Sequence, residues 1–266
     1  MPQGIHGVVL LDKPEGISSQ TAVTIVKRCF GADKAGHTGT LDPMATGLLL
    51  LGIESATKLL TFLVGEDKTY EATIRLGVAT VTDDREGEVI SSAEASALTE
   101  QEILDAIKPL TGEIMQVPSS VSAIKVDGER AYAKVRSGDE VKLKARPVEI
   151  TTFSITNPPQ HLVEAGKTYF DVDVQVDCSS GTYIRALARD LGEALGVGGH
   201  LTALRRTRIG KYTIDQAQQL EELTPESLEV LDIAEAAKQQ FQVRQLSDQD
   251  VIDLRHGKRL KAQGEG

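Results

Sequence analysis

The chain has 266 residues, of which 40% are hydrophobic and 26% are charged, and its formal net charge is −10. This composition excludes wholesale disorder and allows one large core, alone or with a small satellite domain. The sequence has no apolar run of about 18 residues, no secretory signal and no cysteine pattern typical of disulfides or metal sites, so we expect a cytoplasmic protein with no membrane-spanning segment and no bound metal.

The first half of the chain predicts strands and helices in alternation. An apolar run at residues 7–11 indicates a buried strand, and a helix is expected from Ser18 or Ser19 to Gly31. The glycine-rich segment 35–47 predicts a loop that is neither helix nor strand. Further along we expect a strand at 48–53, a short helix at 56–64, a strand at 70–76 and a helix that begins at the capping box 99–102 and stops before Pro109.

The second half predicts mainly strands, at residues 123–126, 148–155 and 169–178, with a helix at 130–136. Residues 182–195 then change to the 3.6-residue period of an amphipathic helix. Because strands and helices are interspersed without regular βαβ repetition, we expect an α+β fold with a mixed, mostly antiparallel sheet flanked by helices.

The C-terminal part predicts a change of domain near residue 241. We expect residues 1–240 to form the main domain and residues 241–266 to begin a small second domain, which is too short to form a core alone.

Charge is segregated along the chain. Residues 81–105 carry eight acidic and one basic side chain, and residues 213–254 carry ten acidic and two basic ones. Residues 125–146 carry seven basic side chains against four acidic ones, and residues 200–212 carry four basic side chains and no acidic ones. Such segregation permits a basic nucleic-acid-binding face on an acidic protein, although ordinary solvated faces would give the same pattern.

The densest cluster of unusual residues is the segment from Gly36 to Gly47. Its three glycines, at positions 36, 39 and 47, indicate a tight loop whose backbone closely approaches another group. Asp42 is the candidate catalytic residue of this loop, but an Asp-Pro pair is also a common turn dipeptide. His37 is equally compatible with an ordinary loop histidine.

The segment 36–47 resembles the signature of the TruB family of pseudouridine synthases, G-H-x-G-x-L-D-P-x-A-x-G. Residues 11–16, 68–72 and 178–185 resemble the lysine-proline, tyrosine and arginine motifs of the family, in the family order. With residues 200–206, the similarity spans roughly residues 5–212. The resemblance implies a pseudouridine-synthase core that isomerises uridine 55 in the TΨC loop of tRNA, without a cofactor, by glycosidic cleavage, rotation of the base and reattachment through C5.

The resemblance also assigns roles at the reacting nucleotide. Asp42 is implied as the catalytic nucleophile, and a covalent adduct, a stabilised oxocarbenium ion and deprotonation of the sugar all remain open as its route. Arg185 is implied to pair with Asp42, which we expect to keep the pKa of that carboxyl low. Tyr70 is implied to stack on the base and is a candidate for proton abstraction at C5.

Further residues are implied to bind or support the substrate. His37 matches the residue that fills the space left when the nucleotide flips out of the RNA loop. Tyr183 and Leu204 match residues that line the uracil pocket, and Lys13 with Pro14 is expected to support the catalytic loop. From their charge, four residues are expected to contact the RNA backbone: Arg205, Arg206, Arg208 and Lys211.

Two departures from the family pattern lie in the chain. Many members carry tyrosine where this chain has Val121, which affects the packing expected around the site. Members usually end with a small RNA-binding domain, often of the PUA type, of which residues 241–266 are expected to be an incomplete beginning.

Two other functions fit the resemblance less well. An archaeal or eukaryotic relative would use guide RNA and partner proteins, and a tRNA-folding chaperone would need no turnover. The stand-alone motifs and the joint presence of Asp42, Tyr70 and Arg185 favour an enzyme that binds tRNA without a guide RNA. We also expect it to be a monomer.

Overall fold

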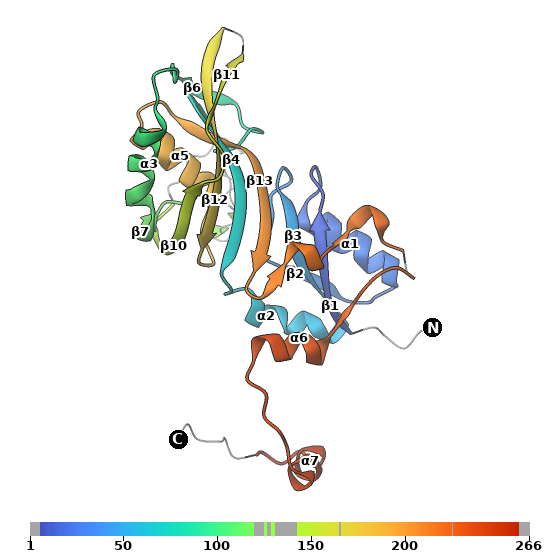
Figure 1. The fold of residues 1–266 in the computed structure, drawn as a ribbon. Coiled ribbons are helices and arrows are strands. Elements are labelled where there is room, and N and C mark those ends of the chain that lie inside the picture. The colour runs from blue at the N-terminus through green and yellow to red at the C-terminus, as the bar shows by residue number, and fades with distance from the viewer. Residues whose placement is uncertain are drawn as a thin grey trace.

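One large mixed sheet organises the chain in the computed structural model, which describes residues 6–119, 125–126, 129–130, 143–164, 166–224 and 226–260 (Figure 1). Its strands follow the order β15 (Gln218–Gln219), β1 (Gly7–Lys13), β3 (Thr46–Ile53), β13 (Gly199–Ile209), β4 (Lys68–Leu76), β12 (Lys167–Cys178), β10 (Arg146–Ile155) and β7 (Gly112–Gln116). Four further strands attach to this path: β2 (Ala35–Thr38), β11 (Gln160–Glu164), β14 (Tyr212–Thr213) and β16 (Leu231–Asp232). Among the described pairings, β1 with β15 and β3 with β13 are parallel and the others are antiparallel, which confirms the expected mixed, mostly antiparallel sheet.

Helices cover the sheet in two groups. The helices α3 (Glu100–Ile107) and α5 (Ile184–Ala194) pack on the half formed by β13, β4, β12 and β10, and α1 (Ser19–Phe30) packs on β2 and β3 (Figure 1). Among the described residues the other helices are α2 (Leu60–Leu63), α6 (Ile233–Gln240) and α7 (Asp248–Arg255), with short 3-10 turns at 54–58, 108–110, 214–216 and 220–222. This arrangement is the expected α+β fold.

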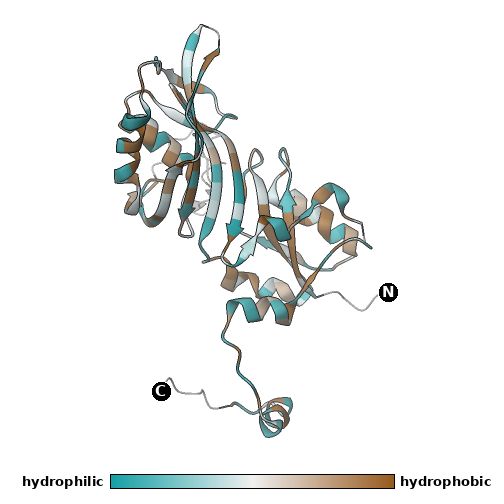
Figure 2. Cartoon of the chain, in the orientation of Figure 1, coloured by the Kyte–Doolittle hydropathy of each residue, from teal (hydrophilic) through white to brown (hydrophobic). Residues whose placement is uncertain are grey.

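The largest hydrophobic core lies between the sheet and the helices α3 and α5. The side of α3 that faces the sheet is hydrophobic and its outer side is hydrophilic (Figure 2). Three residues of the segment between β2 and β3 also enter this core, namely Leu41, Met44 and Ala45. Burial of these side chains fixes the loop that carries Asp42 against the body of the protein.

Several sequence-predicted boundaries are confirmed by the capping geometry. Ser18 caps α1 by accepting a hydrogen bond from the backbone of Thr21, and Gly31 ends that helix in the left-handed conformation. The capping box at Thr99 opens α3. The sequence therefore predicted both ends of α1 and the start of α3 correctly, because helix capping depends on neighbouring residues.

The expectation of a loop throughout 35–47 is wrong at both ends. Residues 35–38 pair with residues 50–53 as β2, and β3 already begins at Thr46. The strand arises because β3 offers a partner edge, a non-local pairing that local glycine content does not reveal.

Other sequence expectations differ from the structure or fall in segments that it leaves undescribed. The helix expected at 56–64 is a 3-10 turn at 54–58 followed by the short α2. Arg130 belongs to the two-residue strand β9 (Glu129–Arg130), which pairs with β8 (Lys125–Val126), so the expected helix does not begin there. Residues 131–136 of that helix, Val121 and most of the basic segment 125–146 lie outside the described residues.

The C-terminal segment leaves the body of the protein after α6. An extended stretch leads to α7, which lies apart from the sheet and its helices (Figure 1). The expected domain boundary near residue 241 stays a prediction. Within the part of the chain described here, no helix is long and apolar enough to cross a membrane.

Candidate functional site

The loop between β2 and β3 is held by hydrogen bonds from Lys13 and Gly16. The carbonyl of Pro43 accepts a hydrogen bond from the backbone of Gly16 at 2.9 Å and lies 3.4 Å from the Lys13 ammonium. Lys13 is fully buried and also donates to the carbonyls of Pro14 and Ile17 at 2.7 and 2.8 Å. The Lys13 side chain and the backbone of Gly16 thus both hold the backbone of the loop that carries Asp42.

Burial of the Lys13 ammonium lowers its pKa to about 8, although the nearby Asp42 carboxylate favours the charged form. The desolvation of the ammonium outweighs this attraction. Lys13 lies beside the loop and does not line the cavity described below.

An ion pair joins this loop to the start of α5. The Nε atom of Arg185 lies 3.0 Å from one oxygen of Asp42, and Nη2 lies 3.3 Å from the other. The guanidinium is 6% exposed, and its Nη1 atom also contacts the carbonyl of Thr82 at 2.9 Å and the carboxylate of Asp84 at 3.4 Å. The structure therefore brings together the predicted partners Asp42 and Arg185.

Asp84 is a site residue that the sequence reasoning missed. Its side chain is 4% exposed and shares Arg185 with Asp42. Asp84 belongs to the acidic segment 81–105, whose composition indicated only a solvated face. A single sequence offers no local signal that separates this buried carboxylate from its exposed neighbours.

The protonation of Asp42 differs from the sequence expectation. Burial raises the pKa of this carboxyl above its ordinary value of 3.8, the Arg185 guanidinium lowers it, and the Asp84 carboxylate raises it further, with a net upward shift. The expectation that Arg185 would keep this pKa low is therefore wrong, because desolvation outweighs the ion pair. The side chain of Asp42 is still 36% exposed, so it remains accessible from the cavity.

A cavity of about 250 Å³ opens beside Asp42. This volume lies below the range of about 300–1,000 Å³ typical of sites for drug-sized ligands. Six of the residues singled out from the sequence line it: Asp42, Tyr70, Tyr183, Arg185, Leu204 and Arg206. The site is therefore small, walled by both aromatic and charged groups, and centred on the ion pair.

Tyr70 and Arg206 form one wall of this cavity. They are partners on the adjacent strands β4 and β13, and the guanidinium carbon of Arg206 lies 6.0 Å from the centre of the Tyr70 ring. Burial raises the pKa of the Tyr70 hydroxyl, although the Arg206 charge opposes the shift. Tyr70 thus stays protonated at neutral pH.

Arg206 is buried, which does not fit the expected contact with the RNA backbone. Its side chain is buried, with Nε donating to the carbonyl of Leu48 and Nη2 to the carbonyl of Gly39, both at 2.8 Å. A Cβ atom at Gly47 would lie 2.2 Å from the carbonyl oxygen of Arg206. The close backbone approach predicted for the glycine-rich loop is confirmed here, and the group approached is Arg206.

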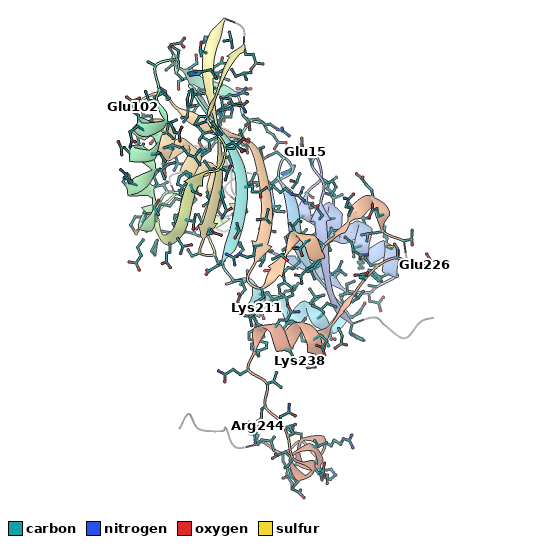
Figure 3. The ribbon with its side chains drawn as sticks, viewed as in Figure 1. Glu15, Glu102, Lys211, Glu226, Lys238 and Arg244 are labelled. Atoms are coloured by element: carbon teal, nitrogen blue, oxygen red, sulfur yellow. The ribbon has the colours of Figure 1, made fainter. Side chains whose placement is uncertain are left out.

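The neighbouring basic residues point to the other face of the sheet. Consecutive residues of a strand face opposite sides, so Arg205 points away from Arg206 and pairs with Asp12 at 2.7 Å. A register shift between residues 206 and 208 returns Arg208 to the same face as Arg205, where it lies 3.5 Å from Asp177. Lys211 is exposed at the turn between β13 and β14, at the opposite end of the central strands from Glu15 (Figure 3).

Two further polar residues lie close to the site. Lys68 lines the cavity, is 6% exposed and donates to the carbonyls of Val64 and Glu66, and burial lowers its pKa to about 8. His37 lies on β2 outside the cavity lining, and burial lowers its pKa. Its Nδ1 atom is buried without a hydrogen-bond partner among the described residues.

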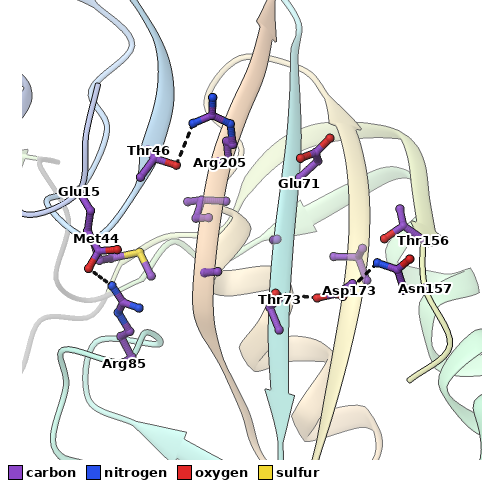
Figure 4. A pocket seen from close by; sticks show the side chains of 14 residues that line it. Glu15, Met44, Thr46, Glu71, Thr73, Arg85, Thr156, Asn157, Asp173 and Arg205 are labelled. Carbon is purple, nitrogen blue, oxygen red and sulfur yellow. Dashed lines mark hydrogen bonds and ion pairs between the residues drawn. The ribbon is translucent and has the colours of Figure 1, made fainter. Parts of the chain in front are cut away.

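A second cavity of about 550 Å³ lies on the Arg205 side of β13 and shares Leu204 with the first (Figure 4). The arginines on its wall are paired, Arg85 with Glu15 and Arg205 with Asp12. The wall also carries Glu71 and Asp173. Asp42, Tyr70 and Arg185 line the smaller cavity and not this one, so the smaller cavity is the candidate site.

The described residues include no candidate metal-binding site. They contain no group of three or more histidine, cysteine, aspartate or glutamate side chains placed to hold a metal ion. Cys178 is buried and Cys29 is half-buried, and both are free thiols.

Comparison with known proteins supplies the family. The model described as TruB family pseudouridylate synthase (N terminal domain) matches residues 27–184, and that of the tRNA pseudouridylate synthase B C-terminal domain matches residues 185–245. The tRNA pseudouridine synthase B of Arthrobacter sp. (strain FB24) is 59% identical over 97% of this chain and 83% of its own length. That of Corynebacterium diphtheriae is 50% identical over 97% of this chain and 85% of its own.

Solved structures with a similar fold support the same family. In the archaeal box H/ACA sRNP Nop10-Cbf5 complex, one chain is 30% identical with a TM-score of 0.56, and the match covers 81% of this chain and about half, 52%, of the other. A chain in an H/ACA RNP bound to a substrate RNA containing 2'-deoxyuridine is 27% identical with a TM-score of 0.61. The match covers 88% of this chain and 61% of that chain. By sequence and by fold, the chain belongs to the TruB family of pseudouridylate synthases.

Proposed function

We propose that this protein isomerises uridine 55 in the TΨC loop of tRNA to pseudouridine, as a stand-alone cytoplasmic enzyme without a cofactor or guide RNA. The observation that carries the proposal is the Asp42–Arg185 ion pair at the edge of a cavity walled by Tyr70. The names of the relatives support tRNA as the substrate.

Asp42 acts on the sugar side of the flipped nucleotide. A carboxylate beside the C1' atom can trap or stabilise the positive charge that develops when the glycosidic bond breaks, as in glycoside hydrolysis, or remove a proton from the sugar. Arg185 orients the carboxylate through two contacts, and Asp84 orients Arg185. The three possible routes of Asp42 remain alternatives within the proposal.

Tyr70 provides a stacking surface for the uracil base. Stacking on an aromatic ring offsets part of the few kcal/mol that base flipping costs. Burial raises the pKa of the Tyr70 hydroxyl, which favours stacking and hydrogen bonding, and proton abstraction at C5 stays its other candidate role. Tyr183 and Leu204 complete the wall around the base.

The RNA backbone is proposed to contact the Arg205 face of β13. Arg205 and Arg208 are 38% and 33% exposed at their side chains, and Lys211 is exposed. Phosphate binding by such side chains releases counterions and makes affinity depend on salt. Arg206 is reassigned from the RNA backbone to the wall of the cavity, and His37 remains proposed to occupy the space vacated by the flipped nucleotide.

Position-resolved mapping of pseudouridine in an unmodified tRNA transcript tests the proposal. The wild-type protein should form pseudouridine at position 55 without additions, and Asp42→Asn should slow the reaction by at least about 10⁴-fold while binding stays nearly unchanged. Asp105→Asn, which removes an exposed carboxylate on α3, is the matched control and should retain wild-type activity.

The other outcomes separate the alternatives. Substantial turnover by Asp42→Asn would remove the nucleophile role. Binding without product in the wild type would instead indicate an RNA chaperone, and product only after addition of a guide RNA and partner proteins would indicate a guided enzyme. Size-exclusion chromatography of the same sample checks the expected monomer.

A further inference from the structure

Two buried polar side chains each bind both backbone groups of one residue next to the ion pair. The Ser19 hydroxyl donates to the carbonyl of Leu41 at 3.0 Å and accepts from its N–H at 2.9 Å. The Gln116 amide donates to the carbonyl of Tyr183 at 3.1 Å and accepts from its N–H at 2.8 Å. Ser19 and Gln116 are each 2% exposed.

The two anchored residues directly control the groups that react. Leu41 immediately precedes Asp42, and Tyr183 immediately precedes α5, whose second residue is Arg185. Each side chain hydrogen-bonds to both the N–H and the C=O of one residue, as a partner residue does in an antiparallel β-sheet. Two such bonds fix both the position and the orientation of a backbone segment, whereas one bond would allow it to pivot.

The supports themselves are rigid parts of the fold. Ser19 is the first residue of α1, and Gln116 is the last residue of β7 at the edge of the sheet. Neither support is close in sequence to the group that it anchors. Asp42 and Arg185 are themselves 143 positions apart, so their separation depends on such long-range contacts.

The ion pair is sensitive to small displacements. Its contact of 3.0 Å lies within the range for N–H···O hydrogen bonds, about 2.7–3.2 Å, and its contact of 3.3 Å lies just beyond it. A displacement of about 1 Å at either end would break them, and misplacement on this scale can cost about 10²-fold in rate.

We propose that Ser19 and Gln116 are positioning residues that set the geometry of the Asp42–Arg185 pair, acting through the backbones of Leu41 and Tyr183. Neither side chain lines the cavity, so neither touches the substrate. The inference rests on the proposed function for its effect on rate, but the geometry of the pair can be followed without turnover.

The decisive readout is the titration of the Asp42 carboxyl, measured by ¹³C NMR on aspartate-labelled protein and assigned with Asp42→Asn. The Arg185 guanidinium lowers the pKa of Asp42, so moving it away should raise that pKa as long as the burial of Asp42 stays the same. Ser19→Ala and Gln116→Met should each raise this pKa by about half a unit or more. Ser19→Thr, which keeps the hydroxyl, should restore the wild-type value.

Ser18→Ala is the matched control for helix stability. Ser18 caps the same helix through Thr21 and makes no recorded contact to the catalytic loop among the described residues. This variant should lower the urea midpoint while leaving the Asp42 titration and kcat unchanged. A merely structural role for Ser19 would make Ser19→Ala behave in the same way, and that result would overturn the proposal.

Kinetics on the tRNA transcript give the second readout. Ser19→Ala and Gln116→Met should lower kcat by about 10- to 100-fold with KM within about 2-fold, because ground-state binding does not depend on the pair. If Gln116→Met does not fold, Gln116→Asn keeps a neutral amide but is one methylene too short to make both contacts with Tyr183, and it should still raise the Asp42 pKa. An unchanged titration in folded variants refutes the positioning role, whereas a wild type without turnover but with the predicted titrations refutes only the proposed reaction.

Discussion

The two faces of the central strands β4 and β13 use the same residue types in opposite ways. On the face toward α5, Arg206 is buried against Tyr70 and donates to two backbone carbonyls, one in the loop that carries Asp42 and one in β3. On the other face, Arg205 and Arg208 remain partly exposed and pair with carboxylates. Adjacent arginines in the sequence thus belong to different parts of the proposed mechanism.

The difference is one of energetics. A buried guanidinium must satisfy its donors inside the protein, so its position is fixed by the groups around it. An exposed ion pair contributes about 0–1 kcal/mol and can exchange its carboxylate for an RNA phosphate at little cost. The cavity face is therefore suited to hold geometry, and the open face is suited to reversible binding.

The largest expected effect contrasts Arg206→Met with Arg205→Met. Removing Arg206 leaves the buried carbonyl of Leu48 and the partly buried carbonyl of Gly39 without their donors, at about 1–3 kcal/mol for a fully buried group. We expect Arg206→Met to lower the free energy of unfolding by about 3 kcal/mol and Arg205→Met by less than about 1 kcal/mol, measured by urea denaturation. Equal losses would show that the two faces do not differ as described.

A smaller effect is expected from Asp84→Asn. Loss of this carboxylate removes one contact that orients Arg185, and we expect kcat to fall by about 10- to 100-fold. Asp42 must be ionised to act, and its raised pKa places the acid limb of activity above the ordinary value of 3.8. Because the Asp84 charge raises that pKa, the limb should move to lower pH in Asp84→Asn.

The neighbouring carboxylate provides the control for that measurement. Asp83 contacts Arg189 and Ser119 instead of Arg185. Asp83→Asn should therefore lower stability and leave the acid limb of kcat/KM in place. An acid limb that moves equally in both variants would remove Asp84 from the control of Asp42.

The smallest expected effect concerns the salt dependence of RNA binding. Each phosphate contact that is lost should reduce the slope of log K against log salt by about 0.7–0.9. Arg205→Gln and Arg208→Gln should each flatten the slope by about this amount in a fluorescence titration with tRNA, and Lys211→Gln should do so if it reaches the backbone. An unchanged slope in all three would place the RNA elsewhere on the protein.

Local chemistry in the sequence predicted much of the fold. The capping of α1 by Ser18, the left-handed Gly31 and the capping box at Thr99 depend only on residues within a few positions of each other, and all are observed. The alternation along residues 169–178 likewise predicted β12, because one side of this strand faces the core. The strand β2 was missed because its existence depends on the edge of β3.

By itself, the sequence determined the family, the loop that carries Asp42 and the residues Tyr70, Tyr183, Arg185 and Leu204 that meet at one cavity. Only the tertiary structure decided which charges are buried there. Because of strand alternation and a register shift in β13, Arg206 points into the protein and Arg205 and Arg208 point outward. The fold also places the Asp84 carboxylate in contact with Arg185. Desolvation by these surroundings raises the pKa of Asp42 despite its arginine partner, because burial is a property of the assembled protein and not of any motif.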